Sequence, residues 1–576
     1  MSAIVSPPRV PAGETGPAIF FIGNGAAVTP DVNAARVGHK AYNLIRMATL
    51  GLPVPPAFAL DTSLCQAFFA ADGRMPSAGA ESLAAGIHWL EGVTGATFGG
   101  ARRPLLVSVR SGAAVSMPGM MDTVLDIGLT DATVQSLIRA TGNPRLAWDS
   151  YRRLIQSYAE VVRDCPPEPF TRVVERFIAA GSWNGPEEFD IGTLKALAEE
   201  FLELVHPLTG AAFPQDPRVQ LVEAAEAVLR SWNSPRAVAY RRLHRLPGDA
   251  GTAITVQAMV FGNAGGTSGA GVGFTRNPAT GTDELYVDYL PGVQGEDVVS
   301  GRFAVRDARY LALVLPKVHD ELNRIKPILE REFKDIQDFE FTVQEGSLYL
   351  LQTRSGKRTP WAAVRIAVDL VNEGLIDPTT ALERLAEIDL ATVSRVRLDT
   401  AGEPIACGIP ASTGVAVGRA AFNPRQARIL AGKGESVILI RGGTAAGDIE
   451  GIAAAEGILT AQGCRTSHAA VVARQLGKVC VVGCGGLRID DKGRTCTIGG
   501  QALASGDLLA IDGDTGAVFA GRVAVRRERP EAALARISEW RNPGSAALVD
   551  HGPENPRAKA DDRPAAKPTD PITSMV

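Results

Sequence analysis

Residues 456–484, EGILTAQGCRTSHAAVVARQLGKVCVVGC, decide the fold of the C-terminal part of this 576-residue chain. The segment EGILTAQG predicts a buried strand that ends in a glycine turn. SHAAVVARQLG predicts a helix that ends at Gly477, and KVCVVGC predicts a second apolar strand. Strands that alternate with helices in this way are typical of an α/β unit.

His468 lies in the first turn of the predicted helix. Backbone N–H groups at that end have no helical partner, and together with the helix dipole they stabilise a bound anion such as phosphate. The same position disfavours imidazolium, so a ring nitrogen stays free to attack phosphorus. Thr466 and Ser467 can cap the helix or donate to phosphoryl oxygens. A capping or packed histidine is the alternative, and the local sequence does not decide between the two.

The composition is that of a globular protein with several domains. The chain has a formal charge of -4 and 45% hydrophobic residues, and its length corresponds to roughly three or four domains. The near-neutral charge gives no reason to expect nucleic acid or a membrane surface as a partner. The N-terminus lacks the features of a signal peptide, and no apolar run reaches the ~18 residues that span a bilayer.

Cysteine usage indicates reduced thiols and a cytoplasmic location, because seven cysteines are sparse and odd in number. Four of them cluster around His468: Cys464, Cys480, Cys484 and Cys496. Their spacing lacks the paired C-x₂-C pattern of zinc sites, so we expect them to pack as small hydrophobic residues.

The chain divides into α/β and α+β segments between two ends that we expect to be disordered, 1–18 and 526–576. Residues 19–356 mix strand and helix patterns, and 131–236 within them are mostly helical. Residues 357–400 predict a helical linker, and 401–525 a glycine-rich α/β unit. Within the first region, DFEFTVQEGSLYLLQTRSG predicts a hairpin that turns at EGS.

Basic side chains follow several of the predicted strands. Arg110 comes directly after an apolar strand and before a Ser/Gly loop, and Arg276 has a similar place in GFTRNP. Arg354 stands at the end of the predicted hairpin, with Lys357 and Arg358 just beyond it. Arginines beside Gly/Ser loops are suited to clamp phosphate groups, although each one alone is as compatible with an ordinary surface charge.

Two carboxylates lie on one face of the hairpin's first strand. In DIQDFEFTVQ the alternation puts Asp338 and Glu340 on one face and Phe339 and Phe341 on the other. Neighbouring carboxylates repel unless a cation lies between them, and beside polyphosphates that cation is usually Mg²⁺. A solvated strand face is the alternative.

Seven stretches, in this order, resemble the pyruvate phosphate dikinase family: GHKAYNLIRMATLGLPVPPAFAL, PLLVSVRSGAAVSMPGMMDTVL, WDSYRRLIQSYAEVV, VQAMVFGNAGGTSGAGVGFTRNPATG, QGEDVVSGR, QDFEFTVQEGSLYLLQTRSGKRT and TSHAAVVARQLGKVCVVGC. They cover nearly all of residues 19–522. The SMPGMMDT loop favours the dikinases over the related phosphoenolpyruvate synthases.

The resemblance implies an ATP-grasp nucleotide-binding region with a helical insert, a helical linker and a swivelling α/β phosphohistidine domain. In the family a histidine takes the β-phosphoryl group of ATP with Mg²⁺, and inorganic phosphate accepts the terminal one, so AMP and pyrophosphate are released. The motif match makes His468 that histidine. It implies that ATP and its phosphates are held by Lys40, Arg110, Asp338, Glu340, Gln352 and Arg354. It also implies that Glu340 and Gln352 hold the metal, with Arg465, Thr466 and Ser467 beside the phosphohistidine.

This sequence departs from the family pattern in three places. The family's Gly-Gly-Lys-Gly-Ala loop is Gly38-His39-Lys40-Ala41-Tyr42 here, and Arg465 replaces the methionine of Gly-Gly-Met. The family continues into a pyruvate-binding TIM barrel of about 250 residues, for which the residues after 526 are too few. We therefore expect the phosphoryl group to pass to pyruvate, or to another acceptor, bound by a separate barrel polypeptide.

Two other functions are compatible with the sequence. The altered Lys40 loop also suits a nucleotide-binding regulatory or scaffold partner of a full-length dikinase, and the same two domains could serve a different small-molecule acceptor. The chain could also form a homo-oligomer. A carrier histidine must move between distant sites, so we expect hinges in residues 357–400 and in CGIPASTG (407–414).

Overall fold

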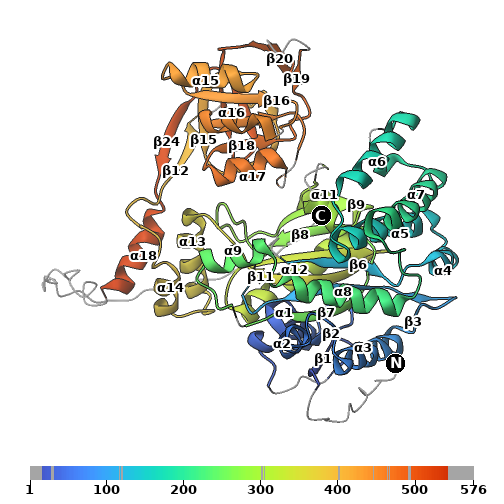
Figure 1. The fold of residues 1–576 in the computed structure, drawn as a ribbon. Helices are drawn as coiled ribbons and strands as arrows, with labels where there is room; N and C mark the ends of the chain where they lie inside the picture. The colour runs from blue at the N-terminus through green and yellow to red at the C-terminus, as the bar shows by residue number, and fades with distance from the viewer. Residues whose placement is uncertain are drawn as a thin grey trace, which may run out of the picture.

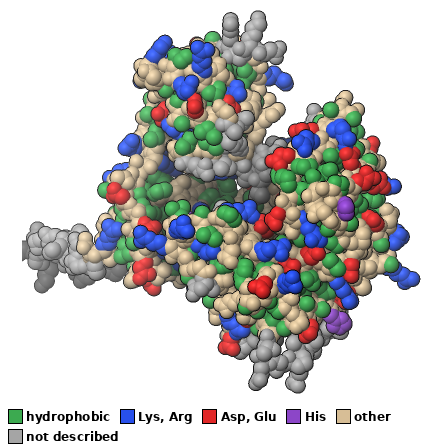
Figure 2. Space-filling model, in the orientation of Figure 1, with side chains coloured by type: hydrophobic (Ala, Val, Ile, Leu, Met, Phe, Trp, Pro, Cys, Tyr) green, Lys and Arg blue, Asp and Glu red, His purple; other side chains and the backbone are tan. Residues whose placement is uncertain are grey.

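The structure is a computed structural model that describes residues 16–26, 31–115, 117, 121–183, 185–248, 250–299, 303, 305–399, 402–444, 446–463, 465, 467–490 and 495–542. It has a larger body, built from the first two thirds of the chain, and a smaller domain joined to it by a narrow neck (Figure 1). Figure 2 shows the smaller domain standing over the larger body, with a hollow between them beside the neck. No helix in these ranges combines the length and apolar character needed to cross a membrane.

An antiparallel sheet of five strands forms one part of the larger body. Its order is β1 (Ile19–Ile22), β2 (Ala57–Leu60), β7 (Ala253–Ala258), β5 (Val107–Gly112) and β6 (Thr123–Ile127). Helices α1 (Ala34–Thr49), α2 (Ser63–Ala70) and α3 (Ser77–Thr94) and the short pair β3 (Thr97–Phe98) and β4 (Pro104–Leu105) accompany it. Phe58, Val109 and Val256 are fully buried, so apolar burial fixes the strands that later carry the site.

A group of helices occupies the region where the sequence predicts mostly helix. It comprises α4 (Asp131–Thr141), α5 (Pro144–Val162), α6 (Glu168–Gly181), the short helix η1 (Pro186–Glu188), α7 (Ile191–Thr209), α8 (Pro217–Ser231) and α9 (Pro235–Leu243). Asn143 caps α5 by accepting from the Leu146 N–H, at 3.0 Å. Tyr151 and Tyr158 on α5 are fully buried, which anchors this helix against the first sheet.

A second antiparallel sheet has four strands in the order β11 (Ser347–Ser355), β10 (Gln337–Gln344), β8 (Gly269–Phe274) and β9 (Tyr286–Pro291). The predicted hairpin is confirmed: Glu345 and Gly346 form its turn with φ of 50° and 79°. Three helices belong to this part: α10 (Gly295–Val299), α11 (Ala308–Val314) and α12 (Pro316–Phe333). Phe339 and Phe341 share a buried core with Leu322 of α12, so the opposite face of β10 is the polar one.

The neck combines helices with a two-stranded ladder. Helices α13 (Pro360–Asn372) and α14 (Pro378–Arg384) agree with the predicted helical linker, but β12 (Arg395–Asp399) is a strand that pairs with β24 (Ala524–Glu528). Helix α18 (Glu531–Arg541) then packs on α13 and α14 through the fully buried Ile537. The prediction of disorder from residue 526 is therefore wrong for residues 526–541, and 543–576 lie outside the described residues.

The smaller domain is built on an eight-stranded mixed sheet. Its order is β13 (Ala406–Cys407), β23 (Ala517–Ala520), β22 (Leu508–Asp512), β15 (Val415–Ala421), β16 (Val437–Arg441), β17 (Gly457–Thr460), β18 (Val479–Val482) and β14 (Ile409–Ser412). Strands β15 to β18 are parallel, and the domain also contains α15 (Pro424–Gly432), η2 (Ala446–Asp448), α16 (Ile449–Ala454), α17 (His468–Gln475) and the small sheet β19 (Arg488–Ile489), β20 (Thr495–Ile498) and β21 (Gln501–Ala504).

Two predictions for this domain have clear outcomes. The hinge expected at residues 407–414 is wrong, because β14 pairs with β18 and forms one edge of the domain's sheet. Cys480, Cys484 and Cys496 are buried, which confirms for these three the prediction that they pack as small hydrophobic residues, while Cys464 lies outside the described residues.

Candidate active site

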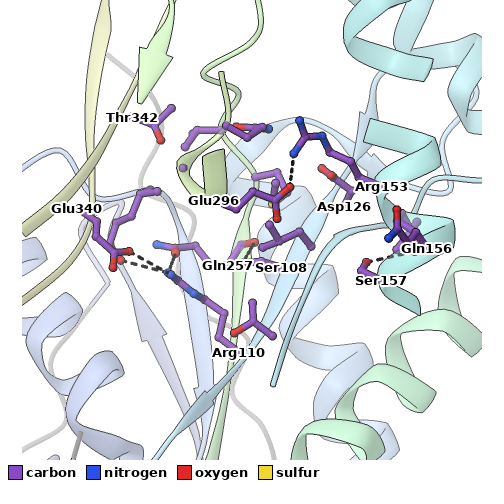
Figure 3. Close-up of a pocket in the computed structure, with 18 of the residues that line it drawn as sticks. Ser108, Arg110, Asp126, Arg153, Gln156, Ser157, Gln257, Glu296, Glu340 and Thr342 are labelled. Atoms are coloured by element: carbon purple, nitrogen blue, oxygen red, sulfur yellow. Dashed lines mark hydrogen bonds and ion pairs between the residues drawn. The ribbon is translucent and has the colours of Figure 1, made fainter. Parts of the chain in front are cut away.

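A cavity of about 680 Å³ lies between the two sheets of the larger body, beside α5 (Figure 3). Strands β5, β6, β8 and β10 and helices α5 and α10 supply its walls. Polar side chains gather at two ends: Arg110, Gln257 and Glu340 at one, and Asp126, Arg153 and Glu296 at the other. The size is typical of a small-molecule site, and the many polar and charged side chains in the lining favour a polar ligand.

Arg110 is the cation at the Gln257 and Glu340 end of this cavity. The sequence predicted Arg110 directly after a strand, but it lies inside β5. Its Nη1 donates to Gln257 Oε1 and to the Leu351 carbonyl, both at 3.3 Å. Its Nη2 lies 3.6 Å from Glu340 Oε2. The guanidinium is thus fixed in place between the two sheets and is suited to bind a phosphate.

The second sheet aligns the other predicted site residues in two rows that cross its strands. Gln352, Glu340, Val272 and Asp288 are direct cross-strand neighbours, and so are Arg354, Asp338, Phe274 and Tyr286. Side chains directly opposite one another in a sheet share a face. Glu340 and Val272 line the cavity, so both rows lie on the cavity face. The predicted pairing of Asp338 and Glu340 on one face is confirmed.

The two carboxylates on that face have different partners. Asp338 is buried and accepts from Arg354 Nε at 2.8 Å, while burial raises the pKa of this carboxyl above its usual range. Glu340 is one third exposed and lies across from Gln352. No cluster of three or more His, Cys, Asp or Glu side chains suited to a metal occurs among the residues the structure describes. A carboxylate facing an amide oxygen still fits Mg²⁺, which binds through one or two protein oxygens and fills its shell with water and phosphate.

Lys40 lies on α1 just after a kink at Gly38, whose φ is 77°. A Cβ on Gly38 would lie 2.2 Å from the Gly112 carbonyl oxygen, so only glycine allows α1 to approach the end of β5 this closely. Burial and then the charge of Arg110 lower the pKa of Lys40 to about 8. The ammonium is therefore close enough to sense Arg110 and Glu340. The bulkier His39 is accommodated because its Nε2 lies 3.1 Å from Asn43 Nδ2 on the next turn.

Not every basic residue that the sequence singled out belongs to this site. Arg276 is 1% exposed and binds Glu330 and Glu373, with its Nη2 at 2.8 and 2.6 Å from their carboxylates. It therefore joins α12 and α13 to the end of β8. Arg358 pairs with Asp335. The prediction of a phosphate clamp at Arg276 is wrong.

The far end of the cavity contains residues that the sequence analysis did not assign. Arg153 on α5 pairs with Asp149, Glu296 and Asp297. Asp126 has a left-handed backbone, with φ of 59°, and burial raises the pKa of its carboxyl to about 8. The motifs WDSYRRL and QGEDVV, which contain Arg153 and Glu296, were the available signal for these residues.

In the smaller domain His468 is the first residue of α17, as predicted. Ser467 takes the N-cap position, but its side chain makes no capping hydrogen bond. Its buried Oγ finds no hydrogen-bond partner in the described part of the chain. Such an orphaned hydroxyl suits the predicted role of donor to a phosphoryl oxygen. Thr466 lies outside the described residues.

Arg465 is the neighbour of this helix start whose side chain is most clearly placed. Its guanidinium pairs with Asp288 of β9, in the larger body. In Figure 1 α17 accordingly lies on the side of the smaller domain that faces β9. The predicted charge beside the histidine is thus engaged in a contact between the two bodies.

The larger body, with a cavity between two antiparallel sheets, is ATP-grasp-like. A neck joins it to a separate α/β domain that has a histidine at a helix start. Two family comparisons agree. The family described as "Pyruvate phosphate dikinase, AMP/ATP-binding domain" matches residues 80–312, and "PEP-utilising enzyme, mobile domain" matches residues 433–516.

Curated relatives give the same result over most of the chain. Pyruvate, phosphate dikinase of Clostridium symbiosum is 43% identical over 509 residues, which is 88% of this chain and 58% of the relative. The Rhizobium meliloti enzyme is 41% identical over 93% of this chain and 62% of its own length, and the Zea mays chloroplastic enzyme 1 is 42% identical over 88% and 54%. The chain belongs to the pyruvate phosphate dikinase family and spans about three fifths of the length of these relatives.

Proposed function

We propose that this chain is a pyruvate phosphate dikinase-like phosphotransferase that phosphorylates His468 from ATP. A ring nitrogen of His468 attacks the β-phosphorus, the bond from that phosphorus to the oxygen bridging to the α-phosphate breaks, and AMP leaves. Inorganic phosphate then accepts the terminal phosphoryl group, which releases pyrophosphate and leaves one phosphoryl group on the histidine. One observation carries this proposal. Arg465, three residues before His468, pairs with Asp288 on the cavity face of the second sheet.

The residues at the Arg110 end of the cavity are assigned to the phosphates. Arg110 is held by Gln257 and Glu340, so it offers a fixed cation without reorganisation. Lys40 adds a second cation beside it. Asp338 orients Arg354 through their ion pair. Ser467 is assigned to donate to the transferred group, because its buried hydroxyl has no hydrogen-bond partner within the described ranges.

Glu340 and Gln352 are assigned to Mg²⁺. They face each other across β10 and β11, and both supply the oxygen donors this ion prefers. When bound, Mg²⁺ neutralises phosphate charge at the reacting end of ATP.

The histidine leaves ATP and delivers its phosphoryl group elsewhere when the smaller domain moves. The neck of β12 and β24 supports this step, because in the described part of the chain it is a narrow two-stranded ladder between the two bodies. The predicted acceptor, pyruvate or another molecule on a separate barrel polypeptide, stays a prediction. The free cysteines of the described part support the predicted cytoplasmic location.

Labelling with β-³²P-ATP, Mg²⁺ and inorganic phosphate tests the proposal. Wild type should gain acid-labile label and release AMP, while His468→Ala should gain none. His88→Ala, a change at an exposed histidine of α3, should label as wild type does. Equal labelling of His468→Ala would overturn the proposal, and nucleotide binding without AMP release would favour the regulatory function instead. A chase of the labelled protein with pyruvate alone then shows whether another polypeptide is needed for transfer.

A further inference from the structure

Arg465 contacts two strands through one guanidinium, β9 of the larger body and β14 of the smaller domain. Its Nη1 pairs with Asp288 Oδ1 of β9, and its Nε donates to the Pro410 carbonyl of β14, at 3.0 Å. Its Cζ lies 4.4 Å from the centre of the Tyr286 ring. Tyr286 and Asp288 are two residues apart on one strand, so they present a ring face and a carboxylate on the same side. Tyr286 and Asp288 together form a contact surface, the β9 seat.

The contact is desolvated on both sides. The Arg465 side chain is 16% exposed and the Asp288 side chain 8%. The bond to Pro410 comes from the smaller domain itself, so it holds the guanidinium in position before the larger body is reached. Removing one partner of a charge pair that is shielded from water is costly, because the other charge is left without a counter-charge.

The β9 seat has a defined relation to the proposed phosphate end of the cavity. Asp288 is in the same cross-strand row as Glu340, with Val272 between them. Strands in a sheet are about 4.8 Å apart, so the two carboxylates start roughly 10 Å from each other on one face. Arg465 precedes His468 by three residues. A clamp at Asp288 therefore holds the start of α17 over the cavity face.

We propose that Arg465 is a positioning residue that docks the phosphohistidine domain on the β9 seat while His468 faces ATP. The inference rests on the proposed function and extends it. Because Arg465 is not among the residues that line the cavity, its loss should slow phosphorylation of the histidine without weakening nucleotide binding. Each departure of the domain must break the pair with Asp288, so docking should weaken as ionic strength rises.

A double-mutant cycle tests the clamp. Arg465→Met and Asp288→Asn should each slow single-turnover labelling by about tenfold or more, with the Kd for ATP unchanged. The double variant should be no slower than the slower single variant, because both changes remove the same contact. Arg428→Met is the matched control, since Arg428 lies in the same domain but pairs with Glu450 on its surface.

Small-angle X-ray scattering supplies a readout that needs no chemistry. Both single variants should show a broader distribution of interatomic distances than wild type and the Arg428→Met control, and high salt should broaden wild type in the same direction. Additive labelling defects, a parallel loss of ATP affinity or unchanged scattering would overturn the clamp. If wild type gains no label, the proposed function fails, and the scattering comparison still decides whether Arg465 docks the domain.

Discussion

Lys40 gives the sharpest prediction for nucleotide binding, because its charge should depend on pH in the working range. Burial, with Arg110 as the second cause, lowers its pKa to about 8 in the free protein. A bound triphosphate brings negative charge next to the ammonium and raises this pKa. Binding at pH 8 should therefore take up about half a proton at Lys40.

The expected size follows from the fraction of Lys40 that is charged. About half of the molecules carry the ammonium at pH 8 and about a tenth at pH 9, so the association constant for ATP should fall about fivefold over that interval. Lys40→Arg stays charged and should lose the dependence on pH while keeping most of the affinity. Lys40→Met should bind weakly at both pH values.

Isothermal titration calorimetry in two buffers of different ionisation enthalpy measures the affinity and the proton uptake together. Asp126, which lines the cavity, likewise has a pKa of about 8, so the series is repeated in an Asp126→Asn background. Lys317→Met, a change at an exposed lysine of α12, is the control. The same slope and proton uptake in Lys40→Arg as in wild type would refute the role given to Lys40.

Three further predictions concern the packing of α1, the histidine loop and the metal. Gly38→Ala should destabilise the fold by about 4 kcal/mol in chemical denaturation, because its Cβ would overlap the Gly112 carbonyl. Gly51→Ala is the control: Gly51 has a similar φ of 72° and no atom within 4 Å of its added Cβ, so this change should cost only about 1 kcal/mol. Ser467→Ala should leave the melting temperature unchanged, because its hydroxyl has no hydrogen-bond partner among the described residues, yet slow labelling about tenfold. Equal labelling would remove Ser467 from the site. Glu340→Gln should raise the Mg²⁺ concentration needed for half-maximal labelling at least about tenfold, and an unchanged Mg²⁺ titration would contradict its assignment.

Local sequence patterns were sufficient to predict those elements whose structure is determined by local interactions. The alternation around Phe339 and the Glu-Gly turn predicted the hairpin, and the capping position of Ser467 predicted the start of α17. These features depend on neighbours within a few residues, where periodicity and turn chemistry carry the information.

Residues with similar local sequences have different roles where partners distant in the sequence determine their contacts. Arg110 and Arg276 both follow glycine- or apolar-rich strand patterns, but Arg276 is buried against Glu330 and Glu373, which are 54 and 97 residues away. The segment 407–414 has the composition of a hinge, yet its pairing with β18 makes it part of a sheet. Ile537 likewise orders a charged segment by packing on α13. Composition alone does not encode such partners.

The central claim is that His468 carries a phosphoryl group derived from ATP. Mass spectrometry of the protein after incubation with β-¹⁸O-labelled ATP, Mg²⁺ and phosphate tests it most directly. The account predicts one heavy phosphoryl group on the peptide that contains His468, lost in acid and absent from His468→Ala. A peptide without phosphate while AMP is still formed, or a phosphate on another residue, would contradict it.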